Sequence, residues 1–234
     1  MDTLQGPLGD GLYGLVIFDC DGVLVDSEVI SCAAVADVLT RHGVPTDIES
    51  VLRNFLGRPA SAVIEYYTKR ANAPVPEDFI SGWRSHLFSR FEKELQAIKG
   101  IRAALEAIEL PRCVASSSDE ERLGVSLTKT GLRDQFAGNI FSTTMVKHGK
   151  PAPDLFLFAA DRMGVDPSRC LVVEDSESGI RAAKAAGMTA VGFTGGSHYL
   201  VLDNTASLRR AGADYIISNA AELPLLLKAP SADG

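Results

Sequence analysis

Two aspartates separated by one residue stand at the end of an apolar run near the start of the sequence. Residues Leu15–Phe18 are followed by Asp19 and Asp21, and Gly22 comes next. A short apolar run rich in β-branched residues predicts a buried strand, and both carboxylates should project to the same side of it. Such a pair can share a metal ion or divide the roles of nucleophile and acid–base catalyst. A strand-terminating turn is the structural alternative, since Asp and Gly are common turn residues.

Polar side chains also follow three later apolar runs. Ser116, Lys150 and the pair Glu174 and Asp175 each lie at the end of such a run or in the loop beyond it. Ligands of an open α/β sheet bind outside the carboxyl ends of its strands, so these groups are expected to meet Asp19. Considered singly, Ser116 and Asp175 could cap the helices that follow them, and Lys150 could be a solvated surface lysine. Their convergence on one edge of a sheet favours a function.

The C-terminal part of the chain has the pattern of an α/β sheet. From about residue 98, short apolar strands alternate with amphipathic helices, which predicts a doubly wound parallel sheet with right-handed crossovers. We expect the run that ends at Asp19 to join this sheet. The predicted strands cover residues 113–116, 140–142, 170–174, 190–193 and 215–218, and the predicted helices are centred near Leu105, Leu127, Phe156, Ala182, Leu208 and Leu226.

Residues 28–97 interrupt the α/β pattern with helical periodicity alone. The second of the predicted helices is opened by a capping box at Thr46 and Glu49, and the third begins near Pro59. The last carries an apolar stripe of the kind that packs inside a helical bundle, formed by Phe79, Trp83, Leu87, Phe91 and Leu95. We therefore predict two domains: an α/β core of residues 1–27 and 98–234, and a helical cap of residues 28–97 that would lie over the site.

The composition limits the range of partners. The chain of 234 residues has a formal net charge of −7 and no basic cluster, which argues against nucleic acid and anionic membranes and favours a small-molecule partner. Its four cysteines have no Cys-x-x-Cys spacing, and Cys20 should point into the core. No stretch resembles a membrane span or a signal peptide, so we expect a cytoplasmic location. A monomer or a weak homo-oligomer is expected, because no apolar helix face lacks an internal use.

Four segments of the chain, taken in order, resemble the motifs of the haloacid dehalogenase superfamily. They are the sequence from Asp19 to Ser27, the strand end at Ser116, the segment Lys150-Pro-Ala-Pro-Asp-Leu-Phe, and the segment Val173-Glu174-Asp175-Ser that continues through Gly179 to Gly187 and Met188. The resemblance runs from about Tyr13 to Leu227. The helical insertion resembles the cap of the branch that contains phosphoglycolate phosphatase and β-phosphoglucomutase.

This resemblance implies a phosphatase that works through an aspartyl-phosphate. Asp19 would attack phosphorus. Asp21 would protonate the leaving oxygen and later deprotonate the hydrolytic water, and both roles require a pKa raised towards neutrality. Mg²⁺ would be held by the carboxylate of Asp19, the backbone carbonyl of Asp21 and Asp175, with Glu174 in or near its coordination shell.

The resemblance also implies a set of phosphate-binding groups. Gly22, Ser116 and the backbone near Ser117 would bind phosphate oxygens, and Lys150 would neutralise the charge of the nucleophile and the phosphate. The substrate would be a small phosphorylated metabolite, either a sugar phosphate or a sugar-acid phosphate, and the cap would select it. On the cap, Arg58 is the candidate for contact with the leaving group, with surface exposure as its alternative.

Three other activities compete with a phosphatase. A dehalogenase would share the Asp19 nucleophile, but it has no use for Asp21. The β-phosphoglucomutase branch has a histidine ten positions after the second aspartate and an arginine three positions after a cap glycine; this chain has Ser31 at the first place and, with Gly57 as that glycine, Ala60 at the second. A response-regulator-like or catalytically silent phospho-binding protein conflicts with the complete set of catalytic residue types.

Overall fold

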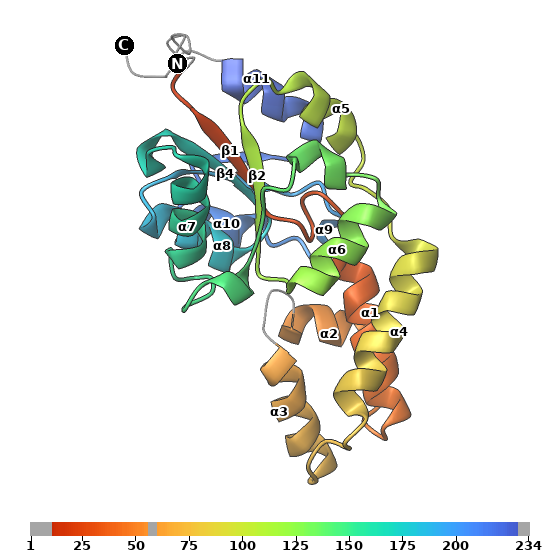
Figure 1. The fold of residues 1–234 in the computed structure, drawn as a ribbon. Helices are drawn as coiled ribbons and strands as arrows, with labels where there is room; N and C mark the ends of the chain where they lie inside the picture. Colours follow the sequence, from red (N-terminus) through yellow and green to blue (C-terminus); the bar gives the residue numbers. More distant parts are fainter. Residues whose placement is uncertain (1–10, 56–59, 229–234) are drawn as a thin grey trace.

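The computed structural model describes residues 11–55 and 60–228. Within them, six parallel strands form one sheet in the order β3-β2-β1-β4-β5-β6 (Figure 1). Strand β1 is central, with Ile17 opposite Cys113 of β2 and Val172 of β4. The predicted parallel sheet and its predicted strands are confirmed. The strands are β1 (Leu15–Phe18), β2 (Arg112–Ser116), β3 (Ile140–Ser142), β4 (Cys170–Glu174), β5 (Thr189–Phe193) and β6 (Tyr215–Ile217).

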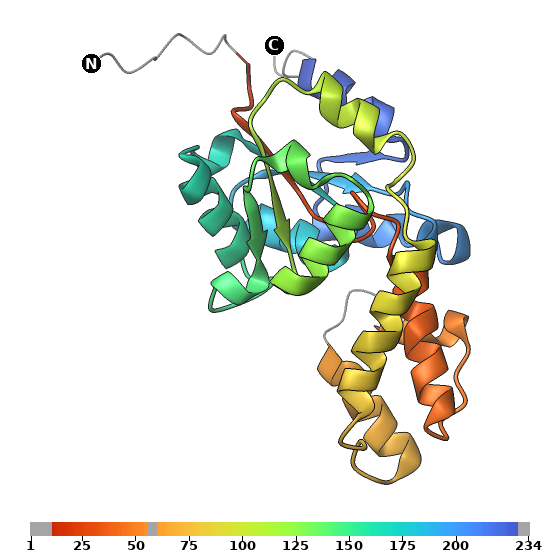
Figure 2. The ribbon, with the colours of Figure 1, turned by 45° about the vertical axis from the view of Figure 1, so that its right-hand side comes forward.

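Helices cover both faces of the sheet (Figure 2). Val16 and Phe18 of β1 belong to an apolar cluster with residues of α5, α6 and α11, whereas Leu15 and Ile17 pack with residues of α7, α8 and α10. This burial on both faces explains the continuous apolar run in β1. The helices are α5 (Ile101–Ala107), α6 (Glu120–Lys129), α7 (Asp154–Met163), α8 (Glu177–Ala185), α10 (Thr205–Ala211) and α11 (Leu223–Lys228).

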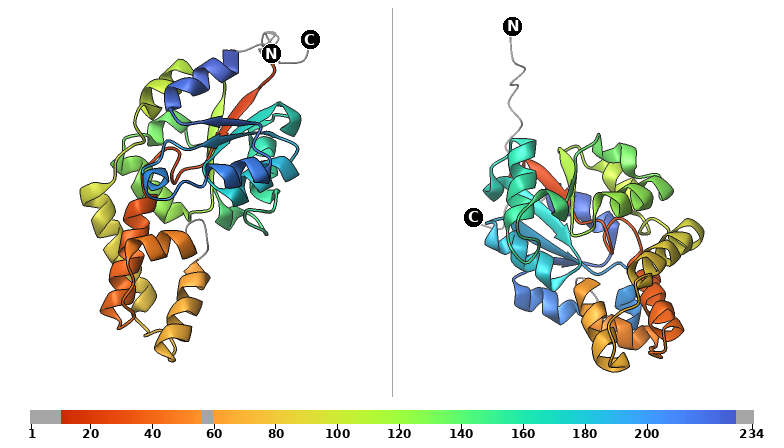
Figure 3. Two further views of the ribbon diagram at one scale, coloured as in Figure 1. Left: turned by 180° about the vertical axis from the view of Figure 1, so that it is seen from behind. Right: turned by 60° about the horizontal axis from the view of Figure 1, so that its bottom comes forward.

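The inserted helices lie beyond the carboxyl ends of the strands (Figures 1 and 3). They enclose an apolar cluster of their own, to which Leu39, Leu52 and Phe79 belong. Further along α4, Leu87, Phe91 and the adjoining Leu95 pack in the cluster of the sheet. The stripe is therefore a packing surface, as predicted, but only its first part packs within the inserted helices. The helices are α1 (Glu28–Arg41), α2 (Ile48–Phe55), α3 (Ala60–Ala71) and α4 (Phe79–Glu94).

The beginning of α2 differs from the prediction. The backbone N–H of Ser50 donates to Asp47 Oδ1 at 2.7 Å, whereas the Thr46 hydroxyl donates to the carbonyl oxygen of Val44 at 2.9 Å. The capping box predicted at Thr46 is therefore wrong by one residue, because the neighbouring aspartate is an equally good cap. The predicted start of the next helix at Pro59 lies outside the described residues.

Two segments that run side by side join the inserted helices to the sheet. The backbone N–H of Asp26 donates to the carbonyl oxygen of Gln96 at 3.0 Å, and that of Ile98 donates to the carbonyl oxygen of Leu24 at 2.9 Å. The insertion thus leaves and re-enters the α/β fold at one place, a few residues beyond β1. We call this paired connection the stem.

The remaining elements are short. Helix α9 (His198–Val201) follows β5 and was not predicted; the 3-10 helices are η1 (Arg133–Phe136), η2 (Thr143–Met145), η3 (Pro167–Arg169) and η4 (Ala220–Glu222). Cys20 is 1% exposed within the apolar cluster, as predicted, and the cysteines are free thiols. In the two described ranges, we find no helix with the length and apolar character that crossing a membrane requires.

Candidate active site

Lys150 lies at the centre of a buried charge cluster at the carboxyl ends of β1, β2 and β4. Its Nζ donates to Asp19 Oδ1 at 2.7 Å, to Glu174 Oε1 at 2.6 Å and to the carbonyl oxygen of Ala115 at 3.0 Å. Its side chain is 2% exposed. Burial would lower the pKa of Lys150, but the two carboxylates raise it above its usual value. Lys150 is therefore a charged partner of both carboxylates, and the surface-lysine alternative is excluded.

The pKa of Asp19 is shifted by burial and by its charged neighbours. Burial raises its pKa to about 7; Lys150 acts in the opposite direction, and the Glu174 and Asp21 carboxylates add to the rise. The side chain is 9% exposed. Because Lys150 binds Oδ1, the cation keeps a buried carboxyl group available in its ionised form.

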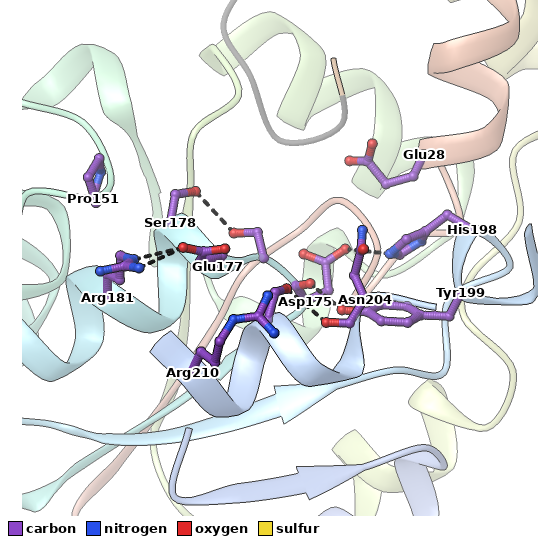
Figure 4. Close-up of a pocket in the computed structure, with 12 residues that line it drawn as sticks. Glu28, Pro151, Asp175, Glu177, Ser178, Arg181, His198, Tyr199, Asn204 and Arg210 are labelled. Atoms are coloured by element: carbon purple, nitrogen blue, oxygen red, sulfur yellow. Dashed lines mark hydrogen bonds and ion pairs between the residues drawn. The ribbon is translucent and has the colours of Figure 1, made fainter. Parts of the chain in front are cut away.

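Asp175 lies beside this cluster and is held by residues that follow β5. His198 Nε2 is 3.3 Å from Asp175 Oδ2, and the Tyr199 hydroxyl donates to the backbone carbonyl of Asp175 at 2.6 Å (Figure 4). Burial, together with the neighbouring Glu174 carboxylate, raises the pKa of Asp175 well above its usual value. Burial also lowers the pKa of His198 to about 4, so a neutral ring faces Asp175.

Three donors bind the carboxylate of Asp21. Ser27 Oγ, Ser118 Oγ and Arg122 Nη2 lie 2.5, 2.6 and 2.7 Å from its oxygens. Burial alone would raise the pKa of Asp21, but Arg122 and the two hydroxyls lower it below its usual value. The expectation of a raised pKa at Asp21 is therefore wrong. The physical reason is a guanidinium on α6 that no local pattern around Asp21 could indicate.

The structure also decides the capping alternatives. Asp119 caps α6 by accepting from the Arg122 N–H at 2.9 Å, and Ser176 caps α8 by accepting from the Gly179 N–H at 3.0 Å. Ser116 and Asp175 are thus not the helix caps. The Ser116 hydroxyl instead accepts from the Ser118 N–H at 3.2 Å, within the loop that follows β2.

Gly22 allows a close approach between the loop after β1 and the end of β4. Its φ is +73°, and a Cβ atom there would lie 1.8 Å from Asp175 Oδ2. A side chain at this position would displace Asp175, which gives Gly22 a structural reason independent of phosphate. Its predicted contact with phosphate stays a prediction.

A cavity of about 530 Å³ separates the strand ends from the inserted helices. The side that we call the core wall is formed by Asp19, Asp21, Ser116, Ser117, Ser118, Lys150, Glu174 and Asp175. On the opposite side, formed by the inserted helices, Glu28, Ser31 and Arg84 are polar. The apolar part of that side, which we call the cap wall, is formed by Val35, Val51, Phe55, Val63, Ile80, Trp83, Leu87 and Phe88. The predicted residues at the strand ends thus meet around one space, whereas Arg58 and Gly57 lie outside the described residues.

The acidic residues of the core wall fit a metal ion. Carboxylate oxygens of Asp19, Glu174 and Asp175 lie within 4.8 Å of one another. Oxygen ligands of this kind are those that Mg²⁺ prefers, and crowded buried carboxylates gain from a shared cation. Glu174 also accepts from Lys150 and, at 2.9 Å, from the Ser176 N–H, so its place in the shell is shared with two donors. The side chain of Asp21 does not belong to this group.

Sequence reasoning missed two residues of the site. His198 follows a strand end, so the rule that singled out Asp19 and Asp175 would have found it had the loop after β5 been included. Arg122 lies inside α6 and contacts a carboxylate 101 positions away. No spacing in the sequence indicates that contact.

The comparisons with known proteins agree with the four motifs. The family of haloacid dehalogenase-like hydrolases matches residues 16–193. The 6-phosphogluconate phosphatase of Escherichia coli K12 is 32% identical and covers 78% of this chain and 83% of its own. The fructose-1-phosphate phosphatase of the same strain is 34% identical, with 76% and 95% covered.

A solved structure extends the likeness to the fold. The haloacid dehalogenase-like protein of unknown function from Agrobacterium tumefaciens C58 superposes with a TM-score of 0.81 and 38% identity, and the match covers 92% of this chain and 97% of that one. The predicted superfamily, the α/β fold and an enzyme related to phosphatases are confirmed. This chain belongs to the haloacid dehalogenase-like hydrolases.

Proposed function

We propose that this hydrolase is a Mg²⁺-dependent phosphatase that acts on a small phosphorylated metabolite, a sugar phosphate or a sugar-acid phosphate, with Asp19 as nucleophile. The observation that carries the proposal is the buried pair of Asp19 and Lys150 beside two further carboxylates, at the floor of a cavity closed by the inserted helices. The phosphatase names of the two bacterial relatives support the substrate class.

The residues of the core wall divide the tasks of such a reaction among them. An oxygen of Asp19 attacks phosphorus, the bond to the leaving oxygen breaks, and an aspartyl-phosphate forms. Lys150, already bonded to Asp19, keeps the nucleophile ionised and offsets the charge of the phosphate. Ser116 and the backbone near Ser117 bind phosphate oxygens. Mg²⁺ held by Asp19, Glu174 and Asp175 would supply further positive charge beside the phosphate.

Asp21 handles the protons in this scheme. It donates a proton to the leaving oxygen and later accepts one from the water that hydrolyses the aspartyl-phosphate. Its lowered pKa suits the second task. For the first task the carboxyl must carry a proton, which requires that Arg122 or one of the serine donors release it.

A phosphate-release assay tests the proposal. p-Nitrophenyl phosphate and a set of sugar and sugar-acid phosphates are incubated with the enzyme, in Mg²⁺ and after exhaustive treatment with EDTA. We expect turnover that requires Mg²⁺ and is abolished in Asp19→Asn, while Asp161→Asn, an exposed aspartate of α7, keeps parental activity. Equal rates for Asp19→Asn and the parent would refute the nucleophile, and full activity after EDTA would refute the metal requirement.

The same assay separates a phosphatase from a phosphosugar mutase. A mutase would convert β-glucose 1-phosphate to glucose 6-phosphate without releasing phosphate. At the position where that branch has a histidine, the Ser31 hydroxyl here accepts a hydrogen bond from Arg122 at 3.0 Å. We therefore expect free phosphate, and no glucose 6-phosphate, from this substrate.

A further inference from the structure

Three cationic side chains line the cavity between the core wall and the inserted helices, within the part of the chain that the structure describes: Arg84, Arg122 and Lys150. Two of them are fully engaged by the protein. Lys150 Nζ donates to three acceptors. Arg84 donates from Nε, Nη1 and Nη2 to the carboxylates of Asp119 and Glu121. Neither side chain has a nitrogen that lacks an acceptor.

Arg122 differs because it is bonded through one nitrogen only. Its Nη2 donates to Asp21 Oδ1 at 2.7 Å and to Ser31 Oγ at 3.0 Å. Across residues 11–55 and 60–228, Nε and Nη1 have no acceptor. Nε is buried, whereas Nη1 is not, and the side chain is 22% exposed and lines the cavity. Nη1 is therefore a donor that a ligand can reach.

The guanidinium group of Arg122 is held from both sides of the cavity. Arg122 belongs to α6 of the α/β core, but Ser31 belongs to α1 of the inserted helices. The guanidinium carbon also lies 5.4 Å from the centre of the Phe91 ring on α4. Because the guanidinium is planar and its donors form a rigid fork, these contacts fix the direction of the nitrogen that remains free.

The contact with Asp21 defines which part of a substrate lies beside Arg122. In the proposed reaction Asp21 donates a proton to the leaving oxygen, so this oxygen lies within hydrogen-bond distance of the Asp21 carboxyl group. Nη1 is attached to the same guanidinium carbon as Nη2, which binds that carboxyl group. The atoms that Nη1 can reach are thus those next to the leaving oxygen, and its N–H groups require an acceptor there.

We propose that Arg122 is a substrate-binding residue: it binds an oxygen on the carbon next to the one that bears the phosphate ester, and so selects phosphomonoesters with an oxygen at this position. The inference rests on the proposed phosphatase activity. A hydroxyl, a carbonyl or a carboxylate oxygen can accept this bond. A leaving group with only hydrogen at this carbon would displace water from Nη1 without replacing the hydrogen bond, which lowers its affinity.

Two substrates that differ by one oxygen test this selection. Glycerol 3-phosphate has a hydroxyl on the carbon next to the ester carbon, whereas 3-hydroxypropyl phosphate has only hydrogen there and keeps the terminal hydroxyl. We expect kcat/KM to be at least about tenfold higher for glycerol 3-phosphate. Equal values, or phosphate release from p-nitrophenyl phosphate alone, overturn the inference. No release from any of the three substrates refutes the phosphatase, and the inference with it.

A variant separates the contact with the substrate from the contact with Asp21. In Arg122→Met, the loss of the bond to Asp21 lowers kcat/KM for both alcohol leaving groups, whereas the loss of Nη1 lowers it only for glycerol 3-phosphate. We therefore expect the ratio of the two kcat/KM values to fall to about one. Arg122→Lys keeps a positive charge without the planar fork, so it should recover part of both rates but not the ratio.

The control is Arg209→Met on the exposed surface of α10, which should keep the parental rates and the parental ratio. A ratio equal to that of the parent in either Arg122 variant overturns the assignment, because the guanidinium would then act on both substrates alike.

Discussion

The core wall and the cap wall of the cavity hold their side chains in different ways. In the core wall, Lys150 has three acceptors and Asp21 has three donors, so each charged group has a direction fixed by several bonds. In the cap wall, Val51 and Leu87 are buried by apolar packing alone. Apolar contacts have little directional preference.

This difference separates two tasks. Directed bonds suit a group that is the same in every substrate, namely the phosphate, because its charge must be met at fixed positions. Apolar packing suits the part that varies, since residues of similar volume can be exchanged at modest cost. Variants in the two walls should therefore affect different kinetic parameters.

The largest effect is expected at Lys150. Lys150→Met removes the charge at similar side-chain length and leaves Asp19 and Glu174 buried without their counter-ion. We expect kcat for p-nitrophenyl phosphate to fall by about 10³. Steady-state kinetics measures the loss, and Lys147→Met, in the exposed part of the same loop, should stay near the parent. A loss of kcat below tenfold would contradict the conclusion that the charge of Lys150 is essential to the reaction at the core wall.

A smaller effect on metal binding is expected at His198. His198→Asn shortens the side chain that faces Asp175 Oδ2, so this proposed metal ligand loses its orientation. We expect the Kd for Mg²⁺ to rise about tenfold, as is usual when a partner of a metal ligand is changed. Titration calorimetry with Mg²⁺ measures it without substrate. His148→Asn is the control, because the side chain of His148 is 59% exposed. Equal affinity for Mg²⁺ in both variants would show that His198 does not orient Asp175.

Two glycine-to-alanine changes compare the tight packing of the core wall with an ordinary helix surface. At Gly179, a Cβ atom would lie 1.8 Å from the Glu174 carboxyl carbon; at Gly124 of α6 the nearest atom is 3.6 Å away. We expect Gly124→Ala to stabilise the fold by about 0.5–1 kcal/mol and Gly179→Ala to destabilise it by about 1–3 kcal/mol. Urea unfolding measures both. Stabilisation by Gly179→Ala would mean that the Glu174 carboxylate has room to move.

In the cap wall, a modest effect on substrate binding is expected at Ile80. Ile80 is 42% exposed and lines the cavity, so Ile80→Ala should cost little stability. We expect KM for sugar phosphates to rise about two- to threefold, with a smaller change in kcat, because the lost contact is apolar and similar in ground and transition states. A fall in kcat larger than the change in KM would show that the cap wall also contributes to the chemical step.

The smallest effect concerns the ion pair between Arg84 of the inserted helices and Asp119 at the start of α6. Hydrogen bonds from Arg84 of α4 lower the pKa of Asp119 on α6 from 3.8 to about 2. Because the folded-state pKa is the lower one, this pair stabilises the fold fully above about pH 4 and is lost as the pH falls towards 2. Asp119→Asn keeps the cap of α6, so it should lose less stability than the parent between pH 5 and 3, by a few tenths of a kcal/mol. Urea unfolding at both pH values tests this.

Much of the core wall could be predicted because its residues lie at strand ends. The apolar runs marked the strands, and parallel strands bring their carboxyl ends to one edge, which placed Asp19, Ser116, Glu174 and Asp175 together. The same periodic signals located the helices on both faces of the sheet.

Contacts between distant elements could not be predicted in this way. Arg122 reaches Asp21 only because α6 packs against the sheet with one particular face, and this contact reversed the expected direction of the Asp21 pKa. Thr46 and Asp47 show a local version of the same limit: two adjacent residues with nearly equal capping ability cannot be ranked from their types alone. The domain boundaries, the role of Gly22 in binding phosphate and the role of Arg58 stay predictions.

The stem has a consequence for the history of such enzymes. The hydrogen bonds from Asp26 to Gln96 and from Ile98 to Leu24 hold the two ends of the insertion side by side. The sheet is therefore connected to the whole insertion as it would be to one short turn. The pairing of the strands would not depend on which segment is inserted at the stem. Related enzymes could thus exchange the inserted helices, and with them the substrate selectivity, while the residues at the strand ends are inherited unchanged.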